Sequence, residues 1–429
     1  MLFTLLGPFA FHLPRATTSL PASRTSTLRA AIPACVPSDK VAELVEPACL
    51  QTLSAIETEQ IELPPTLASG PVTATYARTS VPPAEGVPPV VLLHGFDSSC
   101  LEFRRLLPEL EAVGVEAYAL DILGWGFADT TNSKGVGVDA KRAHLLAFQQ
   151  SVLQRRPMTL VAVSLGAAVV VDFYAAQPEA VASTVLVDPQ CMIDGTPPVP
   201  ERFARAGIKV LGSWPLRSVA NQMAYYDTQR LATDDAIRVG LLHCMRDGWE
   251  DDSIAWLLGG GYSVSSKVQR LSALPSCLIL WGRQDEIIPP ADYLPKFVEA
   301  LPGCFTGADS GSGFRWVERC GHSPHLEQPA VLARAIRATL DGTAVEGDSE
   351  VSEVMTAAAL SPLDKARLKL DELNTLLDTP ILDTAERGGP LEPFKKFART
   401  EPEKAQVAAS VAALTFWALF FRLVFGLFN

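Results

Sequence analysis

Residues 159–170 read TLVAVSLGAAVV, and Ser164 interrupts this otherwise apolar run. The residues before Ser164 are typical of a buried β-strand, and those after it are typical of a helix. Two small residues, Ala162 and Gly166, stand two positions to either side. A sharp strand-to-helix turn requires small side chains there, because bulky ones collide where the chain reverses, and such a turn exposes its central serine. The stretch predicts Ser164 as a candidate nucleophile, with a helix-capping serine as the alternative.

The rest of the chain, from Val72 to about Leu340, alternates short strand-like runs with helical patterns such as 100–114 and 165–177. The strand-like runs are PVVLLHG (89–95), EAYALDILG (116–124), TLVAVS (159–164), STVLVDP (183–189), CLILWG (277–282) and FRWVER (314–319). Such alternation predicts an α/β fold, in which a mostly parallel sheet is covered by helices on both faces. Ligands of such folds bind at the carboxyl ends of the strands.

Two of the predicted strands end in side chains that would activate a serine. Asp285 follows the strand at 277–282, and His322 follows the strand at 314–319. A histidine can take the serine's proton and return it near neutral pH, and an aspartate can hold the imidazole in the required tautomer. The chain order is Ser164, Asp285, His322. We therefore predict these three as the catalytic residues.

Two further residues offer alternatives within this set. Asp188 ends the strand at 183–189 and is a second candidate acid, although an aspartate at a strand end is often a structural acceptor. His325 lies three residues after His322 and is a second candidate base. His94 is expected to brace the loop that follows it, and Asp121 to organise loops at the strand ends.

An acyl-transfer reaction also needs two donors for the negatively charged oxygen of its tetrahedral intermediate. The backbone N–H of Leu165 directly follows the candidate nucleophile, and that of Phe96 directly follows His94-Gly95. We predict these two residues as the oxyanion hole.

These motifs together resemble the Ser-nucleophile α/β-hydrolases of plant and algal plastids. The matching segments are HGFDSSCLEFRRL (94–106), DILGWGFADT (121–130), VSLGAAVVVDF (163–173), WGRQDEIIPP (281–290) and CGHSPHLEQP (320–329). The resemblance covers about residues 60–340 and implies a helical lid at about 190–265. Related members include esterases that remove phytyl chains from chlorophyll or pheophytin, which implies a long-chain ester substrate. Ala162 departs from the family's usual glycine, and 307–313 resembles an insertion.

Composition narrows the function further. The 429 residues carry a net charge of −12, which argues against nucleic acid as a partner because phosphate binding needs a basic surface. The eight cysteines show neither a C-x-x-C pair nor zinc-ligand spacing. No metal and no cofactor are expected.

The two ends of the chain differ from the middle. Residues 1–35 are rich in Ser, Thr and Arg without acidic residues, as in an organelle transit peptide. Residues 341–360 are expected to form an acidic, solvated linker, and 361–429 a small helical module whose partner is unknown. Its last part, 407–428, is apolar and about long enough to cross a bilayer, so we expect a membrane anchor, with a core-packed terminal helix as the alternative.

The expected function is hydrolysis of a carboxylic ester through an acyl-enzyme, with an apolar, lipidic or prenyl ester as substrate, at a plastid membrane. Two alternatives stay open, since one fold serves many reactions. One is a carbon–carbon lyase or hydrolase that acts on a small acid, which convergent arginines in the pocket would favour. The other is a non-catalytic scaffold with the same fold at a membrane.

Overall fold

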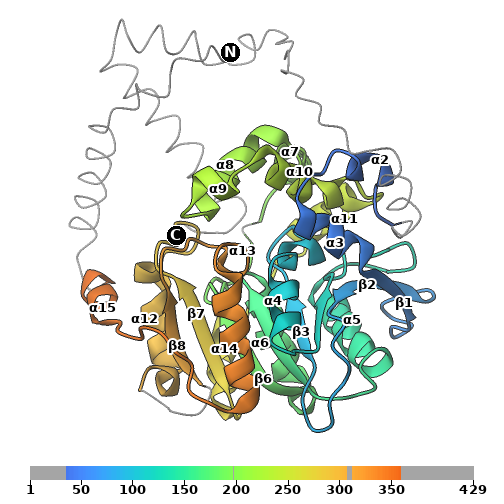
Figure 1. Ribbon diagram of the computed structural model, residues 1–429. Helices are drawn as coiled ribbons and strands as arrows, with labels where there is room; N and C mark the ends of the chain where they lie inside the picture. Colours follow the sequence, from blue (N-terminus) through green and yellow to red (C-terminus); the bar gives the residue numbers. More distant parts are fainter. Residues whose placement is uncertain (1–34, 197, 307–311, 359–429) are drawn as a thin grey trace, which may run out of the picture.

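The computed structural model describes residues 35–358 except residue 197 and residues 307–311. Its centre is an eight-stranded sheet in the order β1-β2-β4-β3-β5-β6-β7-β8 (Figure 1). From β4 to β8 every neighbouring pair is parallel, whereas β1 and β2 run antiparallel at one edge. The strands are β1 (Ile56–Ile61), β2 (Val72–Arg78), β3 (Val90–Leu93), β4 (Ala117–Leu120), β5 (Met158–Val163), β6 (Val181–Val187), β7 (Cys277–Gly282) and β8 (Gly313–Val317).

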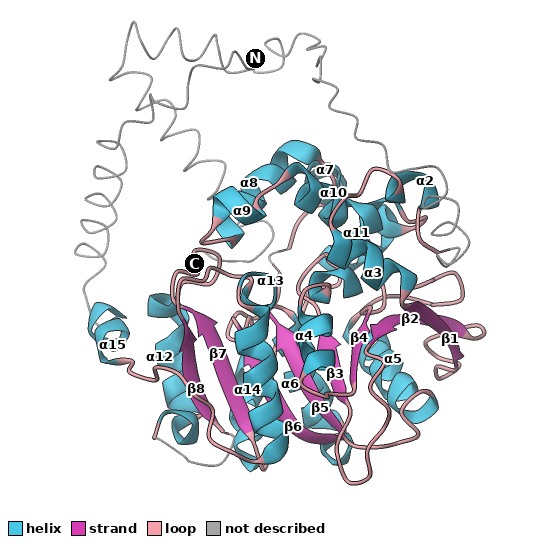
Figure 2. Ribbon diagram, in the orientation of Figure 1, coloured by secondary structure: helices cyan, strands magenta, loops and turns pink. Residues whose placement is uncertain are grey.

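Helices cover both faces of the sheet, as Figure 2 shows. The helices α5 (Val138–Ser151), α6 (Gly166–Ala176) and α12 (Pro290–Ala300) pack on one face, and α4 (Leu106–Ala112) and α14 (Pro329–Asp341) pack on the other. The strands alternate between the two cores that result. In β7, for example, Ile279 and Trp281 belong to the first core and Leu278 and Leu280 to the second. Side chains of successive residues point to opposite faces, so a strand buried on both sides is apolar throughout.

The predicted α/β fold is confirmed, and the six predicted strands correspond to β3 to β8. The predicted helix 165–177 is α6, while the predicted helix 100–114 consists of the 3₁₀ turn η1 (Cys100–Phe103) followed by α4. The antiparallel edge was not predicted in detail. In β1 only the end residues Ile56 and Ile61 are buried and the four between them are exposed, so the strand lacks the apolar–polar alternation by which sequence analysis recognises a half-buried strand.

A helical insertion leaves the sheet after β6 and returns to it at β7 (Figure 1). Its helices are α7 (Glu201–Leu211), α8 (Trp214–Ala224), α9 (Thr228–Leu231), α10 (Asp234–Leu242) and α11 (Trp249–Leu258), and two 3₁₀ segments, η3 (His243–Met245) and η4 (Ser265–Ala273), complete it. The insertion has a small core of its own around Ile208, Leu216 and Trp249. It stands over the carboxyl ends of the strands, where the sequence predicts the site.

Further helices lie near the two ends of the described chain, and α13 still belongs to the predicted domain. The helices α2 (Ser38–Val41) and α3 (Pro47–Ser54) precede β1, and α13 (Pro324–Glu327) and α15 (Ser352–Ala358) lie towards the other end. Residues 345–350 run along β8: the N–H of Trp316 donates to the carbonyl of Asp348 (2.7 Å), and the indole of Trp316 donates to that of Glu350 (2.7 Å). This part of the expected linker is therefore docked on the exposed edge of the sheet, which covers its unpaired backbone groups.

No helix in the described part of the chain is long and apolar enough to cross a membrane. The expected transit peptide at 1–35, except Cys35, and the expected module and anchor at 361–429 lie outside the described residues.

Candidate active site

Ser164 occupies the turn between β5 and α6, in the strained conformation that the sequence predicts. Its φ is 50°, a left-handed value that is rare for a residue with a side chain. Gly166 explains how α6 can begin so close to the sheet, because a Cβ there would lie 2.5 Å from the carbonyl oxygen of Leu93. Ala162 is fully buried in β5, opposite Leu93 and Leu186. The core therefore accommodates the methyl group of Ala162, which stands where the resembled family usually has glycine.

His322 and Asp285 meet at the carboxyl ends of β7 and β8. The Nδ1 atom of His322 lies 2.8 Å from Oδ2 of Asp285. The other oxygen of Asp285 accepts hydrogen bonds from the N–H groups of Ile287 and Ile288, both at 2.8 Å. The turn after β7 thus fixes the carboxylate, and the carboxylate fixes the imidazole with Nε2 turned away from it.

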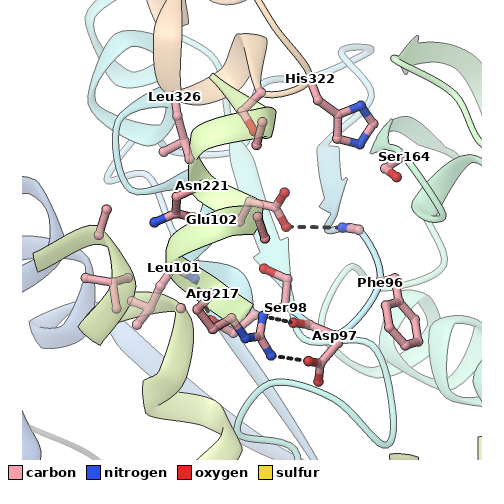
Figure 3. Close-up of a pocket in the computed structure, with 18 of the residues that line it drawn as sticks. Phe96, Asp97, Ser98, Leu101, Glu102, Ser164, Arg217, Asn221, His322 and Leu326 are labelled. Carbon is pink, nitrogen blue, oxygen red and sulfur yellow. Dashed lines mark hydrogen bonds and ion pairs between the residues drawn. The ribbon is translucent and has the colours of Figure 1, made fainter. Parts of the chain in front are cut away.

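The cavity that joins Ser164 to His322 has a volume of about 230 Å³. Figure 3 shows both side chains pointing into it. Its floor is formed by the strand ends and its wall by the insertion, which contributes Leu211, Arg217, Ala220, Asn221, Ala224, Tyr225, Ala236, Val239, Gly240 and His243. Because apolar side chains dominate this wall, the cavity suits an apolar group next to a reactive polar centre.

Of the two alternative residues, Asp188 lies beside Asp285 and His322, whereas His325 pairs with Glu102. Oδ1 of Asp188 accepts a hydrogen bond from the N–H of Gly282 (2.8 Å), which ties β6 to the end of β7. Burial and the neighbouring Asp285 raise the pKa of Asp188 well above its usual range. His325 is fully buried, and its Nε2 lies 3.1 Å from Oε1 of Glu102. His322, not His325, is paired with Asp285.

His94 braces the loop after β3, as expected. Its Nε2 accepts a hydrogen bond from the N–H of Ile122 (3.0 Å), so the proton is on Nδ1, which donates to the carbonyl of Gly95 (2.8 Å). Burial lowers the pKa of His94 to about 4 and so keeps this tautomer neutral. Asp121 accepts from the N–H groups of Cys100 (2.6 Å) and Phe127 (2.8 Å), which joins two loops at the strand ends.

The two predicted oxyanion residues lie on either side of the turn. Leu165 immediately precedes α6, where the backbone N–H groups of a helix start point outward. Phe96 lines the cavity beside Gly95, and a Cβ built on Gly95 would lie 3.3 Å from Cβ of Ser164. The loop after β3 therefore lies directly against the candidate nucleophile, and the role of both N–H groups stays a prediction.

Comparison with known proteins agrees with this geometry. Residues 90–335 match the model of the alpha/beta hydrolase family. The chain belongs to the α/β-hydrolase family. The chain is also similar to the alpha/beta hydrolase domain-containing protein VTE7 of Arabidopsis thaliana. The two are 37% identical over 251 residues, which are 58% of this chain and 72% of that protein.

Solved structures of other hydrolases share the fold. A thermophilic esterase from Thermogutta terrifontis has a TM-score of 0.53 at 19% identity and covers 66% of this chain and 98% of its own. A bacterial membrane phospholipase A has a TM-score of 0.52 at 18% identity and covers 75% and 93%. A 2-hydroxy-6-oxo-6-phenylhexa-2,4-dienoate hydrolase from Rhodococcus has a TM-score of 0.51 at 17% identity, with coverage of 67% and 99%. At these identities the likeness extends to the fold alone.

One group of this hydrolase that the sequence analysis missed is the carboxylate of Asp97, directly after Phe96. It is buried and receives three side chains of the insertion (Figure 3 draws one of them). Arg217 of α8 forms an ion pair with Oδ2, the indole of Trp249 donates to Oδ1 (2.7 Å), and Nε2 of His243 lies 3.2 Å from Oδ1. The partners outweigh the effect of burial and hold the pKa of Asp97 well below its usual range. This cluster, the Asp97 lock, fastens the insertion to the loop of the predicted oxyanion hole.

A second missed group is Glu102, whose carboxylate lines the cavity. Its Oε2 accepts a hydrogen bond from the N–H of Gly95 (3.1 Å). Burial alone would raise its pKa, but His325 and His94 outweigh this effect and lower it to about 2. A negative charge therefore stands near Ser164 at neutral pH. The only signals in the sequence are the acidic residues within HGFDSSCLEFRR, whose partners lie far along the chain.

Proposed function

We propose that this hydrolase cleaves a neutral carboxylic ester with an apolar chain, lipidic or prenyl, through an acyl-enzyme. The observation that carries the proposal is the pairing of His322 with Asp285 at 2.8 Å above the cavity that contains Ser164. In the proposed reaction Nε2 of His322 takes the proton of the Ser164 hydroxyl while Oγ attacks the ester carbonyl. Asp285 stabilises the imidazolium that forms.

The rest of the cycle follows from the same groups. The N–H groups of Phe96 and Leu165 would receive the negative oxygen of the tetrahedral intermediate. When the intermediate collapses, His322 returns the proton to the departing alcohol, and Ser164 keeps the acyl group. A water molecule then gives a proton to His322 and attacks the acyl carbon, and His322 returns this proton to Oγ of Ser164 as the acid is released.

The charges around the cavity favour an ester over a small acid as substrate. Two arginines line the cavity, and both face carboxylates: Arg217 pairs with Asp97, and Arg104 pairs with Glu46 (2.7 Å). Glu102 adds a negative charge, and His243 adds a positive one, because its contacts with Cys244 and Asp97 outweigh burial and raise its pKa to about 9. Neither lining arginine is left without a carboxylate partner to bind an acid, so the carbon–carbon lyase reaction on an acid has less support.

We also propose a plastid membrane as the location. The support is the composition of residues 1–35, the apolar stretch 407–428 and the similarity to a protein of a plant. In this proposal the catalytic domain spans about 60–340 with a lid at about 190–265, and residues 361–429 form a helical module with the anchor. The partners are an apolar ester and the membrane, whereas nucleic acid is not a partner.

The test is labelling of the detergent-solubilised full chain with a fluorophosphonate, next to Ser164→Ala. We expect labelling of the wild type only, and hydrolysis of p-nitrophenyl esters that increases with acyl length from acetate upward. Leu258→Ala, at an exposed position on α11, is the control substitution and should be labelled like the wild type. A folded wild-type chain that neither labels nor releases any activated ester would favour the scaffold interpretation.

A further inference from the structure

The outer surface of α7 and α8 exposes an unusual number of large apolar side chains. Eight such side chains are exposed in the described part of the chain, and four of them lie on these two helices of 11 residues each. They are Phe203 (52% exposed), Val210 (46%), Trp214 (39%) and Val219 (38%). Isolated exposed apolar residues are common, but a cluster marks an interaction surface. We call this set the α7–α8 face.

The sequence of α7 explains why its apolar surface is only half covered. Ala204, Ile208 and Leu211 are buried against the rest of the insertion. Phe203 and Val210 are seven positions apart, so at about 100° per residue they share one side, next to the buried one. The apolar side of α7 is therefore wider than its contact with the protein.

Positive charge borders this surface. Four cationic side chains lie between Glu201 and Ala224, but Arg217 faces the cavity and pairs with Asp97, and Arg205 pairs with Glu201. Arg202 and Lys209 form no ion pair within the described residues, and at about 100° per residue they stand on the side of α7 away from its buried one. The guanidinium of Arg202 lies 4.8 Å from the ring of Phe203, and that of Arg238 lies 5.5 Å from the ring of Trp214.

We propose that the α7–α8 face lies on the surface of a lipid bilayer that contains anionic lipids. A helix with a broad apolar side and cations on its polar side binds in the headgroup region, where aromatic rings enter the interface and Arg and Lys meet phosphates. An anionic bilayer supplies both an apolar layer for the exposed Phe203, Val210 and Trp214 and phosphates for Arg202 and Lys209.

The position of these helices gives the docking a consequence. The inner side of the same two helices lines the cavity through Leu211, Arg217, Ala220, Asn221 and Ala224. Figure 1 shows α7 and α8 at the end of the molecule away from the lower ends of the strands. Docking would place the cavity wall next to the apolar phase in which a lipidic ester dissolves. The inference goes beyond the proposed reaction, since binding needs no hydrolysis.

The test measures hydrogen–deuterium exchange of residues 201–224 in full-length Ser164→Ala protein, bound either to phosphatidylcholine vesicles or to vesicles of phosphatidylcholine with phosphatidylglycerol. The expected anchor at 407–428 would hold the chain on both, so total binding is not the readout. We expect slower exchange of 201–224 on the anionic vesicles only, weakened by salt.

Two variants and a matched control sharpen the test. Phe203→Ser with Val210→Ser should abolish the protection, and Arg202→Gln with Lys209→Gln should raise the anionic lipid concentration that it requires about 25-fold, about fivefold for each cation. Leu258→Ser, on α11 and as exposed as Val210 at 46%, should leave it unchanged.

Three outcomes would overturn the proposal. Exchange of 201–224 could be equal on both vesicles while the chain is bound. Leu258→Ser could abolish protection as fully as the double serine variant. Protection could also appear without lipid and increase with protein concentration, which would assign the face to a second copy of this chain. None of these outcomes bears on Ser164 labelling, so the proposed reaction is tested separately.

Discussion

Two carboxylates near the cavity, Asp285 and Asp97, are held in opposite ways. Asp285 is fixed by N–H groups two and three residues further along its own turn. Asp97 is fixed by Arg217, His243 and Trp249, which follow it by 120, 146 and 152 residues. The first arrangement forms once the turn after β7 has formed. The second requires the whole insertion to be in place over the sheet.

This contrast separates two tasks within one site. The sheet positions the groups that would exchange a proton, because its strand ends are rigid and buried on both faces. The insertion provides the wall around the substrate and is attached to the oxyanion loop through one buried, charged cluster. Changes at Asp285 should therefore affect chemistry with little effect on stability, and changes at Asp97 should affect both.

The largest effect is expected at Asp285. Asp285→Asn should decrease kcat/KM for an activated ester by about 10⁴-fold, because the amide no longer holds the imidazole in the required tautomer. Asp188→Asn should decrease it less than about tenfold. The raised pKa of Asp188 favours its neutral form, and an asparagine preserves both its shape and the acceptor for the N–H of Gly282.

Steady-state kinetics with the full chain in detergent measure both variants, and circular dichroism checks that each is folded. Equal losses for the two would show that the two acids act as one unit. A larger loss for Asp188→Asn would transfer the role of the acid to β6 and contradict the assignment to Asp285.

The next effect is expected at the Asp97 lock. Asp97→Asn leaves the buried Arg217 unpaired, so the free energy of unfolding should fall by about 3–5 kcal/mol and fluorophosphonate labelling should slow. The double change Asp97→Asn with Arg217→Met removes both charges and should recover part of the stability. Chemical denaturation and labelling rates measure the two effects. Unchanged stability in Asp97→Asn would show that the insertion does not depend on this cluster.

The contrast between the two carboxylates also explains what sequence could predict. The strand-turn-helix at Ser164 and the strand ends at Asp285 and His322 are local patterns, since a buried strand is apolar and its end carries the first polar residue. Their meeting then follows from the parallel order of the strands. For this reason the fold and the candidate triad could be predicted from the sequence.

The Asp97 lock and the charge of Glu102 could not be predicted from the sequence in the same way. Arg217 and Trp249 stand on amphipathic helices whose packing angle no local pattern specifies. The segment 345–350 gives another example: its acidic composition is typical of a solvated linker, yet backbone hydrogen bonds to Trp316 hold it on β8. Tertiary contacts determine the conformation of such segments, and amino-acid composition carries no information about those contacts.

A smaller effect is expected where the N-terminal helices join the two regions. Glu46 pairs with Arg104 (2.7 Å) and Arg105 (2.6 Å) of the core, and the N–H groups of Val45 and Glu46 donate to Asp235 of α10 at 3.0 and 2.7 Å. Glu46→Gln should lower the free energy of unfolding by about 1–3 kcal/mol, since it leaves the buried Arg104 without its ion pair.

Glu43→Gln is the matched control, because the ion pair of Glu43 with Lys40 is exposed to solvent and should contribute little to stability. Hydrogen exchange of α10 in Glu46→Gln tells which region is affected. Faster exchange confined to α3 would contradict the role of this segment as a second attachment of the insertion.

The last expected effect is a pH dependence at Lys141, which is buried between the insertion and the core. Its ammonium donates to the carbonyl of Leu123 and lies 3.7 Å from the ring centre of Trp125 and 4.9 Å from that of Trp256 on α11. Burial lowers the pKa of Lys141 to about 7, whereas an unfolded chain keeps a value of about 10.4. Between these two pKa values the unfolded state binds one more proton than the folded state, so the free energy of unfolding increases with pH by up to about 1.4 kcal/mol per unit.

Lys141→Met should flatten this increase between pH 7 and 10 in urea denaturation. Lys296→Met, at an exposed position, controls for the loss of one charge. Parallel profiles for wild type and Lys141→Met would mean that Lys141 stays charged in the folded state, and that its contacts with the two indole rings offset the cost of burial.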